Sequence, residues 1–130
     1  MEILVPVDGS DCSLRALGYA VDMAPRYDAA LHVVHITDSR GVDTEAVLER
    51  ARDVLDAVDL DDDLTVRTDI DLHFRPSKAI GADVLDIVAE DGYDHVVMGH
   101  HGSGALSEAI LGSAAKTVID AQRVPVTVVP

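Results

Sequence analysis

The segment best suited to chemistry is a glycine-rich loop followed by a helical pattern. It reads Met98-Gly99-His100-His101-Gly102-Ser103, and nine residues separate Gly102 from Gly112-Ser113, where the helical pattern begins. Glycine lets the backbone approach a ligand closely and adopt positive φ angles. A helix N-terminus offers unpaired N–H groups and the positive end of the helix dipole, which suit phosphate. The segment therefore predicts a phosphate site, where we expect a side chain added at Gly112 to displace the phosphate.

This loop differs from other phosphate-binding loops in its charge. It contains no Lys or Arg between Gly99 and Ser113, and it does not follow the Walker pattern. Backbone donors, serine hydroxyls and a divalent metal are therefore expected to hold the phosphate. A zinc site at His100 and His101 is disfavoured, because adjacent loop residues rarely ligate the same ion.

A second loop, Asp8-Gly9-Ser10, follows the apolar run at residues 3–7. Asp8 has two candidate roles: a ligand for nucleotide or Mg²⁺, or the Asx cap of a turn beside Gly9. Its place at a strand end favours the binding role. Ser10 or Asp11 is expected to cap the following helix, and Cys12 is expected to be a small packed residue rather than a reactive thiol.

The elements that must position these loops follow from apolar periodicity, which alternates between strand-like and helix-like segments throughout. This pattern predicts an α/β fold, a three-layer doubly wound open parallel sheet of five strands with helices on both faces. The expected strands are residues 3–7, 31–36, 64–74, 95–98 and 124–129.

Two strand orders are compatible with this pattern. In the order 2-1-3-4-5 the strand at 64–74 is central, whereas in 3-2-1-4-5 it lies at an edge. Its strict apolar–polar alternation favours the edge, and so the order 3-2-1-4-5. Strand 124–129 then forms the other edge and is apolar on both faces, which predicts pairing with a second copy of the chain. Both loops converge at the switch point between strands one and four, where ligands bind in such sheets.

Composition limits the class of protein. The length of 130 residues indicates a single domain, 1–130. Apolar runs are too short for a membrane span and no secretion signal is visible, so a cytoplasmic location is expected. The net charge of −14 disfavours nucleic-acid and membrane partners. The chain has 19 Asp and 5 Glu but only 2 Lys, a balance that suits a halophilic, high-salt cytoplasm.

The spacing of Gly99, Gly102 and Gly112-Ser113 resembles the nucleotide-binding branch of the universal stress protein family. The likeness extends to residues 3–10, 31–35 and 124–129 and covers nearly the whole chain. It implies an adenine nucleotide alpha hydrolase-like fold, and the acidic composition adds the expectation of a member from a halophilic archaeon. It also implies a homodimer joined through Val124 to Val129, and bound ATP, or ADP or AMP, with Mg²⁺.

The resemblance further assigns roles by position. Pro6, Val7 and Asp8 would line the adenosine side, Ile36 would pack on adenine and Met98 would flank it. Ser103 stands where the family often has a basic residue. The remaining residues would bind the phosphates: Gly99, Gly102, Ser103, Gly112, Ser113 and Ala114.

Three functions follow as hypotheses. The first is a stress-related nucleotide-binding regulatory module, for which no residue set looks catalytic. The second is a slow ATPase or adenylate-transferring enzyme, for which only Asp8, His100 and His101 are candidate groups. The third is a nucleotide-free dimeric interaction protein, which the glycine spacing argues against. A flavin binder is disfavoured because the chain has no Trp and one Phe, and a phospho-receiver because the last strand has no lysine.

Overall fold

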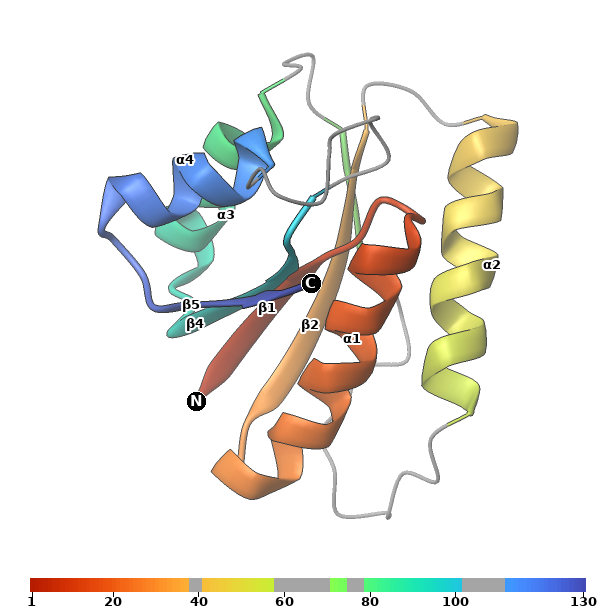
Figure 1. The fold of residues 1–130 in the computed structure, drawn as a ribbon, viewed down its shortest axis with the longest axis horizontal. Coiled ribbons are helices and arrows are strands. Elements are labelled where there is room, and N and C mark those ends of the chain that lie inside the picture. The colour runs from red at the N-terminus through yellow and green to blue at the C-terminus, as the bar shows by residue number, and fades with distance from the viewer. Residues whose placement is uncertain (38–40, 58–70, 75–78, 102–111) are drawn as a thin grey trace.

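The computed structural model describes residues 1–37, 41–57, 71–74, 79–101 and 112–130 (Figure 1). In these residues the chain alternates strands and helices, with one short 3₁₀ turn after the first helix. The strands are β1 (Glu2–Pro6), β2 (Ala30–Thr37), β3 (Asp71–Phe74), β4 (His95–Gly99) and β5 (Val126–Val129). The helices are α1 (Asp11–Met23), η1 (Ala24–Tyr27, the 3₁₀ turn), α2 (Val42–Asp56), α3 (Ile80–Asp91) and α4 (Ser113–Ala121).

The described strands form one parallel sheet in the order β3-β2-β1-β4-β5. The predicted α/β class with a parallel sheet is confirmed, and the order is the one that places the third strand at an edge. Residues 64–70, whose alternation favoured that order, lie outside the described residues. The observed β3 is the short segment Asp71–Phe74, paired with β2 from Val34 to Thr37.

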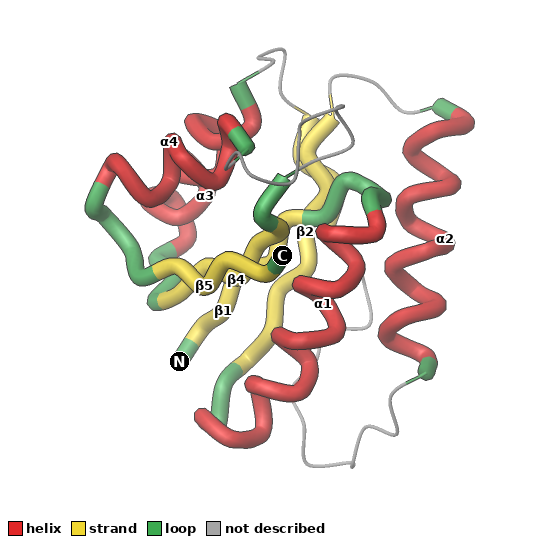
Figure 2. Tube along the Cα trace, viewed as in Figure 1, coloured by secondary structure: helices red, strands yellow, loops and turns green. Residues whose placement is uncertain are grey.

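Helices cover the sheet on both faces, as Figures 1 and 2 show, with α1 and α2 on one side and α3 and α4 on the other. On the first face, Val5 and Val33 of the sheet pack with Leu17 of α1 and Leu55 of α2. These four side chains are almost completely buried. β1 and β2 also carry apolar residues on their other face. The cluster fixes α1 against the strands whose ends carry the Asp8 loop.

On the second face, Leu4 and Val34 pack with Val84 of α3 and Val118 of α4. All four are fully buried. Since successive residues of a strand point to opposite faces, Leu4 and Val5 serve the two different cores. The sheet therefore holds α3 and α4 in place beside the carboxyl ends of β1 and β4.

The start of α1 is set by its N-cap, as predicted. Ser10 has an extended backbone, and its Oγ accepts a hydrogen bond from the Ser13 N–H at 3.1 Å. Such a cap stabilises a helix by about 1 kcal/mol. Cys12 is buried in the same turn, where its Sγ donates to the Val129 carbonyl oxygen at 3.2 Å, so its predicted packing role is confirmed.

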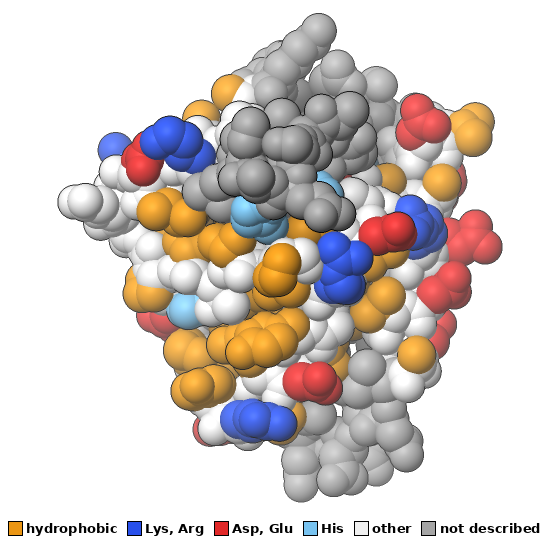
Figure 3. Space-filling view, in the orientation of Figure 1, with side chains coloured by type: hydrophobic (Ala, Val, Ile, Leu, Met, Phe, Trp, Pro, Cys, Tyr) orange, Lys and Arg blue, Asp and Glu red, His pale blue; other side chains and the backbone are white. Residues whose placement is uncertain are grey.

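The edge strand β5 remains partly exposed along Val126–Val129. The carbonyl oxygen of Pro125, just before β5, accepts a hydrogen bond from the Val96 N–H at 3.0 Å, and that of Val129 accepts one from the His100 N–H at 2.7 Å. Because backbone groups alternate in direction along a strand, the N–H and C=O of Val126 and Val128 point away from β4. Figure 3 shows apolar side chains gathered on the face where Figure 1 draws β5.

Within the described residues, no helix is long and apolar enough to cross a membrane.

Candidate functional site

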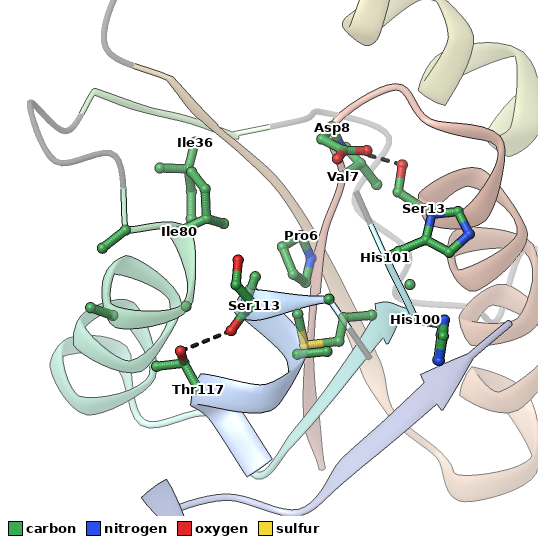
Figure 4. A pocket seen from close by; sticks show the side chains of 18 residues that line it. Pro6, Val7, Asp8, Ser13, Ile36, Ile80, His100, His101, Ser113 and Thr117 are labelled. Carbon is green, nitrogen blue, oxygen red and sulfur yellow. Dashed lines mark hydrogen bonds between the residues drawn. The ribbon is translucent and has the colours of Figure 1, made fainter. Parts of the chain in front are cut away.

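A cavity of about 420 Å³ lies at the carboxyl ends of the central strands. Its walls come from the ends of β1, β2 and β4 and from the first turns of α3 and α4 (Figure 4). This is the switch point between β1 and β4, where the strand order reverses. The lining residues that the sequence analysis named as site residues are Pro6, Val7, Asp8, Ile36, Met98, Gly99, Gly112, Ser113 and Ala114. Gly102 and Ser103, also named there, lie outside the described residues.

The Asp8 loop is held by short-range hydrogen bonds. Asp8 Oδ1 accepts from the Ser10 N–H at 2.9 Å, which is the Asx turn considered from the sequence. Ser13 Oγ accepts from the Asp8 N–H at 3.3 Å and donates to the Ser10 carbonyl oxygen at 3.0 Å. Asp8 also lines the cavity, so its structural role does not turn it away from a ligand.

Gly9 is the position in this loop where glycine is required. Its φ angle is +81°, and a Cβ there would lie 2.8 Å from Cγ2 of Val47 on α2. Arg50 of α2 donates to the Gly9 carbonyl oxygen and pairs with Asp11 at 2.7 Å. Helix α2 therefore contacts the Asp8 loop through Val47 and holds it through the hydrogen bond from Arg50. It lies on the face of the sheet opposite α3 and α4.

Val7 is fixed through both of its backbone polar groups. Its N–H donates to the Val34 carbonyl oxygen at 2.9 Å, and its carbonyl oxygen accepts from Nδ1 of the buried His35 at 2.8 Å. A carbonyl oxygen only accepts, so Nδ1 must carry the hydrogen. Both backbone polar groups of Val7, which lines the cavity, are thus already bonded within the protein.

The start of α4 supplies the donors of the site. Gly112 is its N-cap and has no side chain to cap the helix, and the first intrahelical bond runs from Lys116 N–H to the Gly112 carbonyl oxygen at 2.9 Å. The N–H groups of Ser113, Ala114 and Ala115 therefore have no partner within the helix. All three residues line the cavity.

The roles of Gly99 and Gly112 correct the expectation from the sequence. Neither has a positive φ angle. A Cβ at Gly112 would lie 2.9 Å from Cα of His101, and one at Gly99 would lie 3.0 Å from Sγ of Cys12. The absence of a side chain at Gly99 and at Gly112 thus leaves room for neighbouring parts of the chain, namely Cys12 beside Gly99 and His101 beside Gly112. A side chain at Gly112 would therefore press on the His100–His101 turn.

The first turn of α3 is the part of the wall that the sequence analysis missed. Ala79, Ile80, Gly81 and Ala82 all line the cavity. Figure 4 shows Ile80 and Ile36 toward one side of the cavity and Asp8 toward the other. The sequence did offer a topological signal. A helix that follows a parallel strand begins at the carboxyl end of that strand, where the ligand-binding loops also lie. Further lining residues not named as site residues are Ser13, His100, His101, Ala115 and Thr117.

The charges of the described lining are few. Asp8 is its only carboxylate, and His100 and His101 are its only basic side chains. Over the described residues there is no group of three or more His, Cys, Asp or Glu side chains arranged to hold a metal ion. The cavity therefore combines apolar surface, one carboxylate, two imidazoles and the N–H groups at the start of α4.

The chain is similar to known proteins over its whole length. The sequence model of the universal stress protein family matches residues 1–130. The chain belongs to the universal stress protein family. Its relative "Universal stress protein MJ0531" of Methanocaldococcus jannaschii is 27% identical over 137 residues, which cover 98% of this chain and 81% of that protein.

Solved universal stress protein structures resemble this fold over the whole chain. One, described in complex with cAMP, has a TM-score of 0.72 at 26% identity and covers 99% of this chain and 95% of its own. Another, from Archaeoglobus fulgidus in complex with dAMP, has a TM-score of 0.72 at 22% identity and covers 100% of this chain and 98% of its own. These likenesses agree with the parallel α/β architecture.

Proposed function

We propose that this universal stress protein binds an adenine nucleotide, ATP or alternatively ADP or AMP, in the cavity between β1, β4, α3 and α4. The observation that carries the proposal is the start of α4, where Ser113, Ala114 and Ala115 line one cavity and their N–H groups have no intrahelical partner. Such a helix end binds phosphate through hydrogen bonds and the dipole. The solved relative in complex with cAMP supports the adenine nucleotide class.

The shape of the cavity gives the ligand a direction. The apolar lining residues Ile36, Ile80 and Met98 suit the adenine ring, and the start of α4 suits the phosphates. Asp8 would lie near the adenine or ribose. Gly99 and Gly112 would shape the loop, and Gly102 and Ser103 keep their predicted place beside the phosphates.

Mg²⁺ fits this site only in company with the nucleotide. Asp8 is the sole carboxylate of the described lining, and its Oδ1 already accepts from the Ser10 N–H. Mg²⁺ is usually bound by one or two carboxylates together with substrate phosphates and water. We therefore propose that Mg²⁺ enters on the phosphates, where it would neutralise charge that the described lining, which has no Lys or Arg, leaves uncompensated.

The output that we propose is regulatory: a stress-related homodimer, joined through β5, whose conformation or partner binding changes with the nucleotide. The partly exposed Val126–Val129 edge supports the dimer. We place the protein in the cytoplasm of a halophile, because the net charge of −14 favours a medium in which salt screens repulsion. Unfolding that begins at higher temperature in molar KCl than in dilute buffer would support that placement, and the reverse would contradict it.

Calorimetric titration of Ser113 variants with ATP, ADP and AMP in high-salt buffer with Mg²⁺ tests nucleotide binding at this site. Ser113 is exposed at the first position of α4. A carboxylate there suits the helix dipole, so Ser113→Asp should keep the fold or stabilise it, yet it would repel phosphate. Ser113→Asn is the matched neutral control. We expect affinity to fall at least about tenfold in Ser113→Asp and much less in Ser113→Asn, since 1.4 kcal/mol corresponds to a factor of ten. Equal affinity in both variants would place the phosphate elsewhere.

A further inference from the structure

The two histidines after β4 stand out in the charge inventory of the cavity. His100 and His101 are the only side chains of the described lining that can become positively charged. Nearby cations are engaged with other partners. Lys116 pairs with Asp120, Arg50 with Asp11, and Arg15 Nε donates to the Pro130 carbonyl oxygen at 2.8 Å.

We propose that His100 and His101 supply the positive charge for the phosphate, so that binding of the nucleotide takes up a proton. This inference rests on the proposed function and assigns the two residues as phosphate-binding groups of the same site. Histidine is the side chain that gains its proton between about pH 8 and pH 5. A charged imidazole donates a hydrogen bond to phosphate that is roughly twice as strong as one between neutral groups.

Backbone contacts hold the His100–His101 turn next to the start of α4. The His100 N–H donates to the Val129 carbonyl oxygen at 2.7 Å, and the His100 carbonyl oxygen accepts from the Gly112 N–H at 2.8 Å. The turn is therefore tied to β5 on one side and to the start of α4 on the other. His101 follows directly, with its Cα 2.9 Å from the position that a Gly112 Cβ would take.

The two rings lie close to each other. Their centroids are 5.7 Å apart with the planes at 83°. The described charged groups on the neighbouring elements include Asp8 after β1, Asp11 and Arg15 on α1, Asp83 on α3 and Lys116 on α4. Asp8 also lines the cavity and is the only carboxylate of the described lining.

The probe for this inference is cAMP, because its phosphodiester carries one fixed negative charge over the pH range in which histidine titrates. Affinity is measured by calorimetry on the full chain between about pH 8 and pH 5.5, where histidine changes charge. ATP is measured in parallel. We expect the affinity for cAMP to rise about tenfold toward the acidic end, as a charge-assisted hydrogen bond forms. Proton uptake should appear as a dependence of the binding heat on the ionisation heat of the buffer.

The decisive comparison is the double variant His100→Gln/His101→Gln, which keeps neutral donors but no titrating group. Its pH profile should be flat, whereas that of the control His95→Gln should match the wild type, because His95 lies at the other end of β4. Nucleotide binding with the same pH profile in wild type and double variant, whether of cAMP or of ATP, would overturn the inference and leave the proposed function standing. Absence of binding of every adenine nucleotide at every pH would overturn both.

Discussion

His35 of β2 donates from Nδ1 to the carbonyl oxygen of Val7 at 2.8 Å, and so fixes the strand end that lines the cavity. Val34 and Ile36 on either side of it pack toward α3 and α4, so His35 reaches Val7 from the α1 and α2 face. It acts on the site without touching the cavity, as a positioning residue.

The first prediction follows from this bond. His35→Leu leaves the Val7 carbonyl oxygen without its donor, which costs about 1–3 kcal/mol for a buried group. His35→Asn places an amide N–H near the position of Nδ1 and should recover part of the loss. We expect weaker ATP binding and a lower free energy of unfolding in His35→Leu, with both partly restored in His35→Asn. Urea unfolding and calorimetry would measure them, and identical behaviour of the two variants would contradict the positioning role.

The second prediction concerns Gly112. A Cβ at this position would lie 2.9 Å from Cα of His101 and 3.0 Å from the carbonyl oxygen of His100. Gly112→Val should therefore displace the His100–His101 turn, abolish nucleotide binding and destabilise the fold by about 1–3 kcal/mol, the usual cost of overpacking. Dimerisation should persist, because β5 is untouched.

The matched control is Gly18→Val in α1. A Cβ at Gly18 has no neighbouring atom within 4 Å, so this variant should bind nucleotide as the wild type does. Thermal unfolding and ATP titration of both variants give the test. A Gly112→Val protein with unchanged melting temperature and unchanged affinity would show that the tight packing of this loop has no consequence.

The third prediction concerns pH and stability. Burial lowers the pKa of His95, whose Nε2 lies 2.8 Å from Thr127 Oγ1. A His with a lowered folded-state pKa binds fewer protons folded than unfolded, so its contribution is full above about pH 6.5 and is lost as the pH falls below that value. His95→Gln removes this titration. Between pH 7.5 and 5.5 the wild type should lose more stability than the variant in urea unfolding, and parallel curves would refute the linkage.

The fourth prediction concerns the β5 edge. The N–H of Val128 points away from β4, so Val128→Pro removes an edge donor while the hydrogen bonds that Pro125 and Val129 accept from β4 stay in place. Val128→Thr keeps both the N–H and a β-branched side chain. If two copies pair through this strand, light scattering should show a monomer for Val128→Pro and a dimer for Val128→Thr. A dimer of Val128→Pro as stable as that of the wild type would place the interface elsewhere.

Most of the fold follows from local sequence rules. The apolar runs of β1 and β2 predicted strands buried on both faces, and Ser10 predicted the start of α1, because a strand period and an N-cap depend on a few adjacent residues. The Asp8 turn was predictable for the same reason. Gly99 and Gly112 were predicted as site residues and do line the cavity, but the close contacts that leave no room for a side chain there were not predicted.

The remaining features depend on contacts between segments distant in the sequence. A Cβ at Gly81 would lie 2.6 Å from Cβ of Thr117, a closeness of α3 to α4 that no local pattern reveals. The same contact brings Ile80 to the cavity wall. Likewise, the bond from His35 to Val7 joins residues 28 positions apart, and it exists only once β1 and β2 have paired.

The central claim is that phosphate binds at the start of α4, and the most direct measurement is the backbone amide NMR spectrum of the ¹⁵N-labelled protein during titration with ATP. The account predicts large shifts at the N–H groups of Ser113, Ala114 and Ala115. It predicts smaller shifts at Gly92, which caps the C-terminal end of α3, the end remote from the cavity. Saturable binding that leaves the three α4 amides unchanged would contradict it.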